Sequence, residues 1–119
     1  MESPSANKAM IRSLYAAINA GDLDIIETLF APDFVDHSTP EQDAGPEGVR
    51  QYFRELRAAL PDLHVTIDDL LTEGEKVVVR TGWRGTTPGG NEHSRSLIQI
   101  FRIVDGAIRE EWNEGGALL

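Results

Sequence analysis

The sequence predicts an α+β domain, in which helices come first and pack on one face of a curved antiparallel or mixed sheet. Apolar residues recur at helical spacing as far as about residue 60, and strand-like runs separated by turn signals follow to the end of the chain. The Asp105-Gly106 dipeptide lies between runs rich in Ile and Val, which is the strongest short-range signal for a β-hairpin. We expect a cone-shaped domain in which the sheet and the helices can enclose a pocket.

Three helices are expected before the sheet. The first covers about residues 6–19 and has Gly21 as its C-terminal cap. The second is short and must end before Pro32, and the third begins at Pro46 and closes at Pro61. Their apolar stripes are Met10, Ile11, Leu14, Tyr15 and Ile18; Leu23, Ile26, Leu29 and Phe30; and Val49, Tyr52, Phe53, Leu56 and Leu60.

The second half of the chain is expected to form strands at about residues 62–71, 75–86, 94–104 and 107–114. Regular alternation on the last strand groups Ile108, Glu110 and Trp112 on one face, and Glu111 with Asn113 on the other. Both faces of the preceding strand are largely apolar, so we expect helices to cover one face and a second subunit the other. A homodimer is the expected assembly.

Composition limits the classes of function. With 119 residues and 40% hydrophobic content, the chain fits one globular domain over residues 1–119, with residues 1–6 loose. A net charge of −9 argues against binding to nucleic acid or to an anionic membrane. Without cysteine there is no disulfide, thiolate nucleophile or Cys-based metal site. The sequence shows neither a secretion signal nor a membrane-spanning run, so we expect a cytoplasmic protein.

Six motifs carry a resemblance to a known family. They are Asn-Ala-Gly-Asp-Leu-Asp at 19–24, Ala-Pro-Asp-Phe-Val-Asp-His at 31–37, Gly-Val-Arg-Gln-Tyr-Phe at 48–53, Leu-Pro-Asp-Leu-His-Val-Thr-Ile-Asp-Asp-Leu at 60–70, Ile-Phe-Arg-Ile-Val-Asp-Gly-Ala-Ile at 100–108 and Glu-Glu-Trp at 110–112. By these motifs the chain resembles the SnoaL-like polyketide cyclases, within the group that shares the nuclear transport factor 2 fold. The resemblance implies a cone-shaped domain and cofactor-free ring closure by an intramolecular aldol reaction.

The chain departs from the family pattern at two chemically important places. The resemblance places the acid/base aspartate of the family at Gln99, where an amide cannot take up a proton near neutral pH. The family's Glu-His-Trp is replaced by Glu110-Glu111-Trp112, and the loop over the pocket mouth is reduced to residues 85–94. The usual cyclase mechanism is therefore in doubt. A buried Gln99 needs a partner from a neighbouring side chain or a ligand.

His37 and Gln99 are the candidate catalytic residues. The resemblance places His37 at the pocket, where an imidazole can relay protons near neutral pH. The alternative role for His37 is structural, as a hydrogen-bonded link between loop and sheet. The candidates for an aromatic substrate pocket are Tyr15, Phe34, Phe53, Trp83 and Trp112. For most of these residues the favoured interpretation is ordinary core. A buried Tyr15 hydroxyl needs a partner, which is either a pocket water or ligand oxygen or a group in the core.

Arg80 lies within an apolar strand and requires a carboxylate partner or a bound anion. The candidate partners are Asp68, Asp69, Glu110 and Glu111. A structural cross-strand ion pair is the favoured interpretation. The alternative is a substrate-binding arginine flanked by carboxylates, similar to the Asp-Arg-Asp arrangement with which limonene epoxide hydrolase activates water.

Three functions stay open at this point. The first is a cofactor-free cyclase or isomerase acting on a small hydrophobic, polyketide-like carbonyl compound, with His37 as proton shuttle and Gln99 holding an enolate oxygen. The second is an epoxide-hydrolase-like hydrolase built on Arg80, and the third is a non-catalytic protein that binds a small hydrophobic molecule. No metal is expected, because the three histidines lack ligand spacing.

Overall fold

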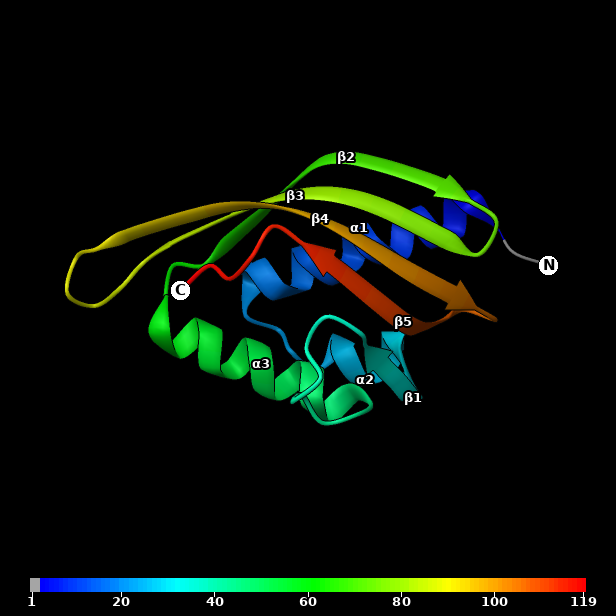
Figure 1. Ribbon diagram of the computed structural model, residues 1–119, viewed down its shortest axis with the longest axis horizontal. Coiled ribbons are helices and arrows are strands. Elements are labelled where there is room, and N and C mark those ends of the chain that lie inside the picture. The colour runs from blue at the N-terminus through cyan, green and yellow to red at the C-terminus, as the bar shows by residue number, and fades with distance from the viewer. Residues whose placement is uncertain (1–2) are drawn as a thin grey trace.

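The computed structural model describes residues 3–119 and consists there of three helices and five strands (Figure 1). The elements are α1 (Pro4–Ala20), α2 (Ile25–Leu29), β1 (Phe30–Asp36), α3 (Pro46–Ala59), β2 (His64–Glu73), β3 (Lys76–Thr86), β4 (Glu92–Val104) and β5 (Ala107–Glu114). None of the helices in this part of the chain is long and apolar enough to span a membrane.

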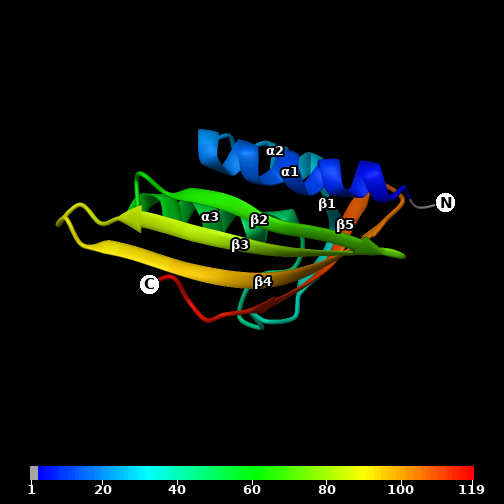
Figure 2. The ribbon, with the colours of Figure 1, turned by 90° about the horizontal axis from the view of Figure 1, so that it is seen from above.

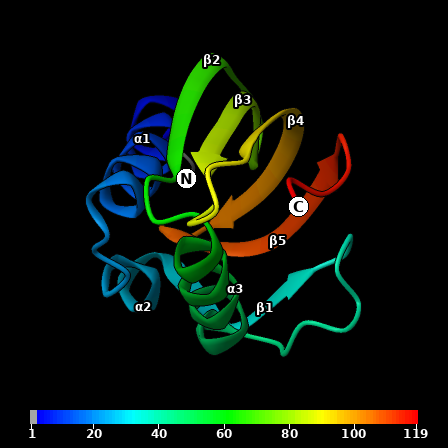
Figure 3. The ribbon, with the colours of Figure 1, turned by 90° about the vertical axis from the view of Figure 1, so that its left-hand side faces the viewer.

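The strands form one mixed sheet in the order β1-β5-β4-β3-β2. β1 runs parallel to β5, and the other neighbours are antiparallel. The long strands curve, α1 lies along the sheet, and α3 faces its concave side (Figures 2 and 3). The expected α+β class, with helices packed on a curved sheet, is confirmed.

Local signals explain where α1 begins and ends. The Ser3 hydroxyl accepts a hydrogen bond from the Ala6 N–H at 3.2 Å, and Pro4 occupies the first turn. Gly21 ends the helix with a φ of 79°, a left-handed conformation that favours glycine. The helix thus begins two residues earlier than expected at residue 6. Of the segment expected to be loose, residues 1 and 2 lie outside the described part of the chain.

The strand β1 was not expected, because its sequence lacks the alternation that indicates a strand. Phe30 was assigned to the second helix, which the structure ends at Leu29. Pro32 has no N–H to donate, and it is tolerated because β1 lies at the edge of the sheet. The Asp105-Gly106 hairpin is confirmed, with φ values of 52° and 75° as a type I′ turn requires.

The hydrophobic core lies between the concave face of the sheet and the helices. Its fully buried members include Ile11, Leu14 and Ile18 of α1, Val77 and Val79 of β3, Phe101 and Ile103 of β4, and Ile108 of β5. Alternate residues of these strands point to the convex face, where no helix packs. On that face Ile98 is 50% exposed and Leu71 is 64% exposed.

The strand β5 contains one residue more than its partner. Ile108 lies opposite Ile103, whereas Glu110 lies opposite Arg102, so one step along β4 matches two steps along β5. Arg109 is therefore the extra residue of a β-bulge.

The bulge changes which side chains of β5 share a face. Ile108 is buried in the core together with Glu111, and Asn113 faces the same concave side. Glu110 and Trp112 face the convex side. The prediction that Ile108 shares a face with Glu110 and Trp112 is therefore wrong, since it assumed an unbroken alternation.

Candidate functional site

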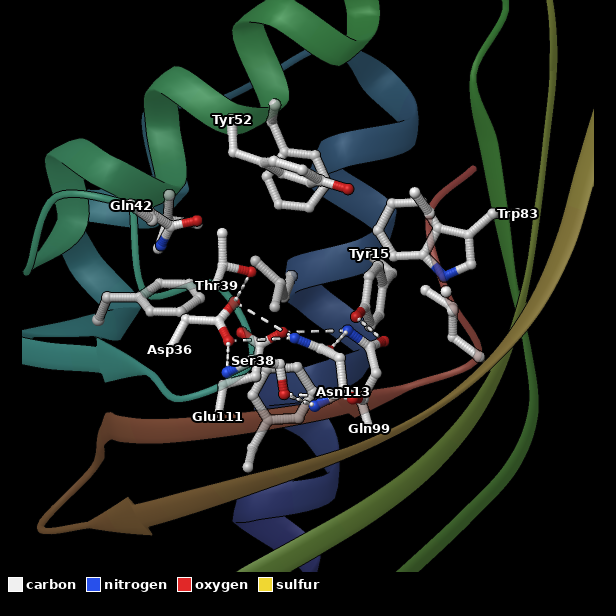
Figure 4. Close-up of a pocket in the computed structure, with 18 of the residues that line it drawn as sticks. Tyr15, Asp36, Ser38, Thr39, Gln42, Tyr52, Trp83, Gln99, Glu111 and Asn113 are labelled. Atoms are coloured by element: carbon white, nitrogen blue, oxygen red, sulfur yellow. Dashed lines mark hydrogen bonds between the residues drawn. The ribbon is translucent and has the colours of Figure 1, made fainter. Parts of the chain in front are cut away.

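A cavity of about 380 Å³ lies between the concave face of the sheet and the helices α1 and α3 (Figure 4). One part of its wall is apolar and aromatic, formed by Leu14, Phe30, Val49, Phe53, Trp83, Leu97 and Phe101. The other part is polar and includes Asp36, Ser38, Thr39, Glu41, Gln42, Glu111 and Asn113. A mostly apolar hollow of this size with a few convergent polar groups is typical of a small-molecule site.

Gln99 occupies the centre of a hydrogen-bond network at the cavity wall. Its Oε1 accepts hydrogen bonds from the hydroxyls of Tyr15 and Thr81, the second at 3.2 Å. Its Nε2 donates to Glu111 Oε2 at 3.1 Å and to Asn113 Oδ1 at 2.7 Å. Both amide hydrogens are thus engaged by neighbouring side chains. Gln99 is held in place by the protein and has no hydrogen left for an enolate oxygen in this arrangement.

Glu111 is the buried carboxyl group of the site. Its residue is only 9% exposed, and burial is the main cause that raises its pKa to about 8. The negative charge of Asp36 adds to the increase, while hydrogen bonds from the amides of Asn113 and Gln99 oppose it. Near neutral pH Glu111 is therefore mostly a protonated acid that can donate to a ligand oxygen.

Asp36 is the neighbour of Glu111 across the parallel pair β1 and β5. Burial raises its pKa, but its oxygens accept hydrogen bonds from the Ser38 N–H at 2.9 Å, the Thr39 hydroxyl at 3.3 Å and the Asn113 amide at 3.2 and 3.3 Å. These bonds favour the ionised form. The site therefore contains two carboxyl groups with unequal tendencies to hold a proton.

Three of the predicted aromatic pocket residues line the cavity, namely Tyr15, Phe53 and Trp83. Trp83 stacks on Phe53 with 5.8 Å between ring centroids and meets Tyr15 edge-on at 5.8 Å. The indole N–H of Trp83 donates to the Thr81 hydroxyl at 2.8 Å. These contacts fix the rings at one end of the cavity.

His37 and Trp112 are not among the residues that line the cavity. The His37 ring stacks on Trp112 with 4.9 Å between centroids, and its Nε2 lies 3.0 Å from Glu110 Oε1. The Lys76 ammonium lies 5.2 Å from the centroid of the Trp112 ring. This group sits on the convex side, because Trp112 and Glu110 point away from Glu111 on the same strand.

Phe34 and Arg80 also lie outside the cavity lining. Phe34 is fully buried and packs edge-on against Phe30 at 4.8 Å. The Arg80 side chain is 47% exposed, and its Nε donates to Asp69 Oδ2 at 2.7 Å, with Asp68 Oδ2 at 3.7 Å from Nη1. Asp69 is paired with Arg80 across β2 and β3, which supports a structural cross-strand ion pair.

Glu111, Asp36 and Asn113 were missed as a group by sequence reasoning. Without the bulge, the Asp105-Gly106 turn would place Trp112 opposite Gln99, whereas the structure places Asn113 there. A doublet of glutamates on an apolar strand is a signal of a buried carboxyl, but it does not tell which glutamate faces inward. Within residues 3–119, no three His, Asp or Glu side chains form a group that could hold a metal ion.

The curved mixed sheet and the helices together enclose a cavity with polar side chains at its centre. This arrangement is the cone-shaped fold of the nuclear transport factor 2 type. Residues 11–111 match the model of the SnoaL-like domain, so the chain belongs to this family. No curated protein matches the chain significantly in sequence.

Solved structures of similar proteins agree with this assignment. TsrD from Streptomyces laurentii is 29% identical with a TM-score of 0.88, over 97% of this chain and 91% of that one. IdmH from Streptomyces antibioticus, a proposed polyketide cyclase, is 30% identical with a TM-score of 0.80, over 96% and 92%. AclR from Streptomyces galilaeus, a proposed hydroxylase, is 25% identical with a TM-score of 0.84, over 96% and 91%.

Proposed function

We propose that the protein is a cofactor-free enzyme of the cyclase or isomerase type, acting by acid/base chemistry on a small hydrophobic carbonyl compound. The observation that carries the proposal is the pair of carboxyl groups, Glu111 and Asp36, in an otherwise mostly apolar and aromatic cavity. Two carboxyls whose environments differ are a common basis for separate acid and base roles. The similarity to a proposed polyketide cyclase supports the carbonyl substrate.

Asp36 and Glu111 each transfer one proton in the first step of the reaction. The ionised Asp36 removes a proton from the carbon next to the substrate carbonyl, and the protonated Glu111 gives its proton to the carbonyl oxygen. The product of this step is an enol. Return of the proton from Asp36 to a different carbon, with Glu111 taking back the enol O–H proton, isomerises the substrate. Alternatively, the enol carbon attacks a second carbonyl of the same molecule and closes a ring, while Glu111 takes back the enol O–H proton and Asp36 gives its proton to the new alkoxide oxygen.

Gln99 and Asn113 act as positioning residues in this scheme. Gln99 holds Glu111 through its amide, and Asn113 contacts both Gln99 and Asp36. His37 receives no acid/base role, because it lies on the convex side of the sheet against Trp112.

The rate is expected to depend on pH in a bell-shaped manner. It falls as pH rises through about 8, because Glu111 then loses the proton that it must donate. It also falls on the acidic side as Asp36, whose pKa is raised, takes up a proton. The measurement that checks this is the initial rate of hydrogen exchange into a carbonyl substrate between pH 4 and pH 10.

Hydrogen exchange into a panel of carbonyl compounds tests the proposal. The protein is incubated in D₂O with aromatic polyketide compounds and cyclic enones, and carbon-bound deuterium or a new product is followed by mass spectrometry. We expect exchange with at least one compound, and a loss of about 100-fold or more in Glu111→Gln and in Asp36→Asn. Gln and Asn keep the shape and remove the acid.

The controls separate this proposal from the alternatives. His37→Ala and Arg80→Lys are expected to keep the exchange rate, because neither residue lines the cavity. Compounds that bind and return without exchange would instead indicate a non-catalytic binding protein. Loss of activity in Arg80→Lys, with Glu111→Gln unchanged, would favour a hydrolase.

A further inference from the structure

Most polar side chains of the cavity wall donate their hydrogen bonds within the protein. The lining residues that do so are Tyr15, Ser38, Thr39, Trp83, Gln99 and Asn113. Within residues 3–119, two other side-chain donors of the lining have no such bond, namely the Tyr52 hydroxyl and the Gln42 amide. Together with the protonated Glu111, these groups are left to bind a ligand.

Tyr52 projects from α3 into the cavity, on the side away from the sheet (Figure 4). Its ring meets the Phe53 ring edge-on, with 5.2 Å between the centroids, and this contact supports its orientation. The residue is 41% exposed, so it lies where the cavity opens to solvent. The hydroxyl is therefore a positioned donor that an entering ligand can reach.

The Tyr52 hydroxyl also lies within the electrostatic range of the two carboxyl groups. Burial is the main cause that raises the pKa of Tyr52 above its ordinary 10, and the negative charges of Glu111 and Asp36 raise it further. Charges separated by more than a Debye length, roughly 8–10 Å, are largely screened. Tyr52 is thus a neutral donor near neutral pH, and it is close enough to Glu111 for one small molecule to contact both.

The Gln42 amide is less suited to act together with Glu111. It belongs to the loop between β1 and α3, and Figure 4 shows it well apart from the Tyr52 hydroxyl. Donors carried by helices and strands are held more precisely than donors carried by loops. The geometry therefore favours Tyr52 as the partner of Glu111 in binding a ligand.

Glu111 and Tyr52 face the cavity from opposite sides. Glu111 comes from the sheet strand β5, and Tyr52 comes from the helix α3. Beside them lie the stacked Phe53 and Trp83 rings, which suit an apolar frame. A molecule that spans the cavity from the sheet to the helix can offer one acceptor oxygen to each donor.

We propose that the Tyr52 hydroxyl forms a second oxygen-binding subsite, and that the ligand is a dicarbonyl compound with one oxygen at Glu111 and the other at Tyr52. This inference rests on the proposed function and adds a substrate-binding residue to the same site. In ring closure, the enol carbon attacks the carbonyl that Tyr52 holds, and the hydrogen bond makes that carbonyl carbon more electrophilic. Tyr52 keeps its proton, because Asp36 supplies the proton that the new alkoxide oxygen takes up.

Paired probes that differ only in the second carbonyl test the inference. They are 5-, 6- and 7-acetyl-1-tetralone, each compared with the ethyl-1-tetralone substituted at the same position, titrated into the protein at pH 7 by calorimetry. We expect at least one acetyl compound to bind about three- to tenfold more tightly than its ethyl counterpart, as one additional hydrogen bond provides.

Variants assign this preference to one hydroxyl. Tyr52→Phe is expected to reduce binding of the acetyl compound to the level of the ethyl compound, while unchanged binding of the ethyl compound shows that the cavity is intact. Gln42→Met removes the other free donor and is expected to keep the preference. Gln51→Met is the matched control on α3, since Gln51 is exposed, donates to Glu55 and is not part of the lining.

Several outcomes overturn the inference. It fails if no acetyl compound binds more tightly than its ethyl counterpart, if the preference survives in Tyr52→Phe, or if Gln42→Met abolishes the preference and Tyr52→Phe does not. Deuterium exchange next to the tetralone carbonyl separates the two proposals. Exchange without an acetyl preference rejects the Tyr52 subsite alone, and a Tyr52-dependent preference without exchange into any compound rejects the acid/base function alone.

Discussion

Glu111 couples the stability of the protein to pH in a direction opposite to that of an ordinary surface carboxylate. Its pKa is about 8 in the folded protein, against the ordinary 4.5, so the folded state holds the proton more tightly than the unfolded chain does. The contribution of Glu111 is therefore most favourable below about pH 4.5, and it is lost progressively as pH rises towards 8.

Replacing this carboxyl by an amide tests the linkage. Glu111→Gln is expected to raise the free energy of unfolding at pH 8 to 9, on the order of a few kcal/mol, and to change it little at pH 5. The measurement is urea denaturation of both proteins at several pH values. Glu114→Gln is the control, because an exposed carboxyl has no comparable desolvation. Equal destabilisation of Glu111→Gln at every pH would contradict the assignment.

At the scale of single residues, the polar pattern of the sequence was informative but incomplete. Gln99 was correctly expected to lie on a largely apolar face and to need a partner, and its buried side chain finds four of them. The identity of those partners depends on strands that meet only in the folded sheet. Sequence reasoning therefore found Gln99 and missed the grouping of Glu111 with Asp36.

The loop between β1 and α3 depends on close packing at the start of the helix. A Cβ atom at Gly48 would lie 1.9 Å from the Asp43 carbonyl oxygen and 2.9 Å from Gln42 Cγ. The backbone of this loop can therefore approach α3 only if position 48 has no side chain. Because Gln42 lines the cavity, this contact also shapes the site.

Gly48→Ala is expected to lower the free energy of unfolding by about 1–3 kcal/mol, since a backbone atom in the way cannot be avoided by a rotamer change. The gain in helix propensity, about 1 kcal/mol, does not offset the clash. Urea denaturation provides the measurement. Gly89→Ala is the control, because its nearest contact would be the Thr87 Oγ1 at 4.0 Å. Unchanged stability of Gly48→Ala would show that the loop moves away freely.

Among the elements, those governed by local signals were predicted best. Helical spacing, Gly21 and Pro46 located α1 and α3, and a dipeptide located the β4–β5 hairpin. The edge strand β1 was missed because its sequence lacks regular alternation and contains Pro32. The bulge at Arg109 was missed because the sequence carries no mark of an inserted residue in a strand.

At the scale of the whole molecule, the convex face of the sheet is the expected surface of contact with another protein chain. Val78, Ile100 and Trp112 are paired side by side across β3, β4 and β5, and Ile98 next to this row is 50% exposed. Apolar residues gathered on a sheet face often mark a contact between proteins. We propose that a second copy of the chain covers this face.

Ile98→Glu is expected to shift the protein from dimer to monomer, because it would place a charge within the apolar contact. Native mass spectrometry and sedimentation equilibrium at micromolar concentration provide the measurement. Leu119→Glu is the control, since Leu119 is also exposed, at 56%, but lies after the last strand of the sheet. A wild-type protein that sediments as a monomer would contradict the proposal.

The sequence by itself determined the order of helices and strands, the hairpin and the family, because these depend on spacing and motifs within short stretches of chain. Only the tertiary structure decided which polar side chains share the cavity. The bulge at Arg109 turns Asn113 towards Gln99, and the pairing of β1 with β5 brings Asp36 beside Glu111. The first contact depends on a bulge that the sequence does not mark, and the second joins segments more than 70 residues apart, which local periodicity does not record.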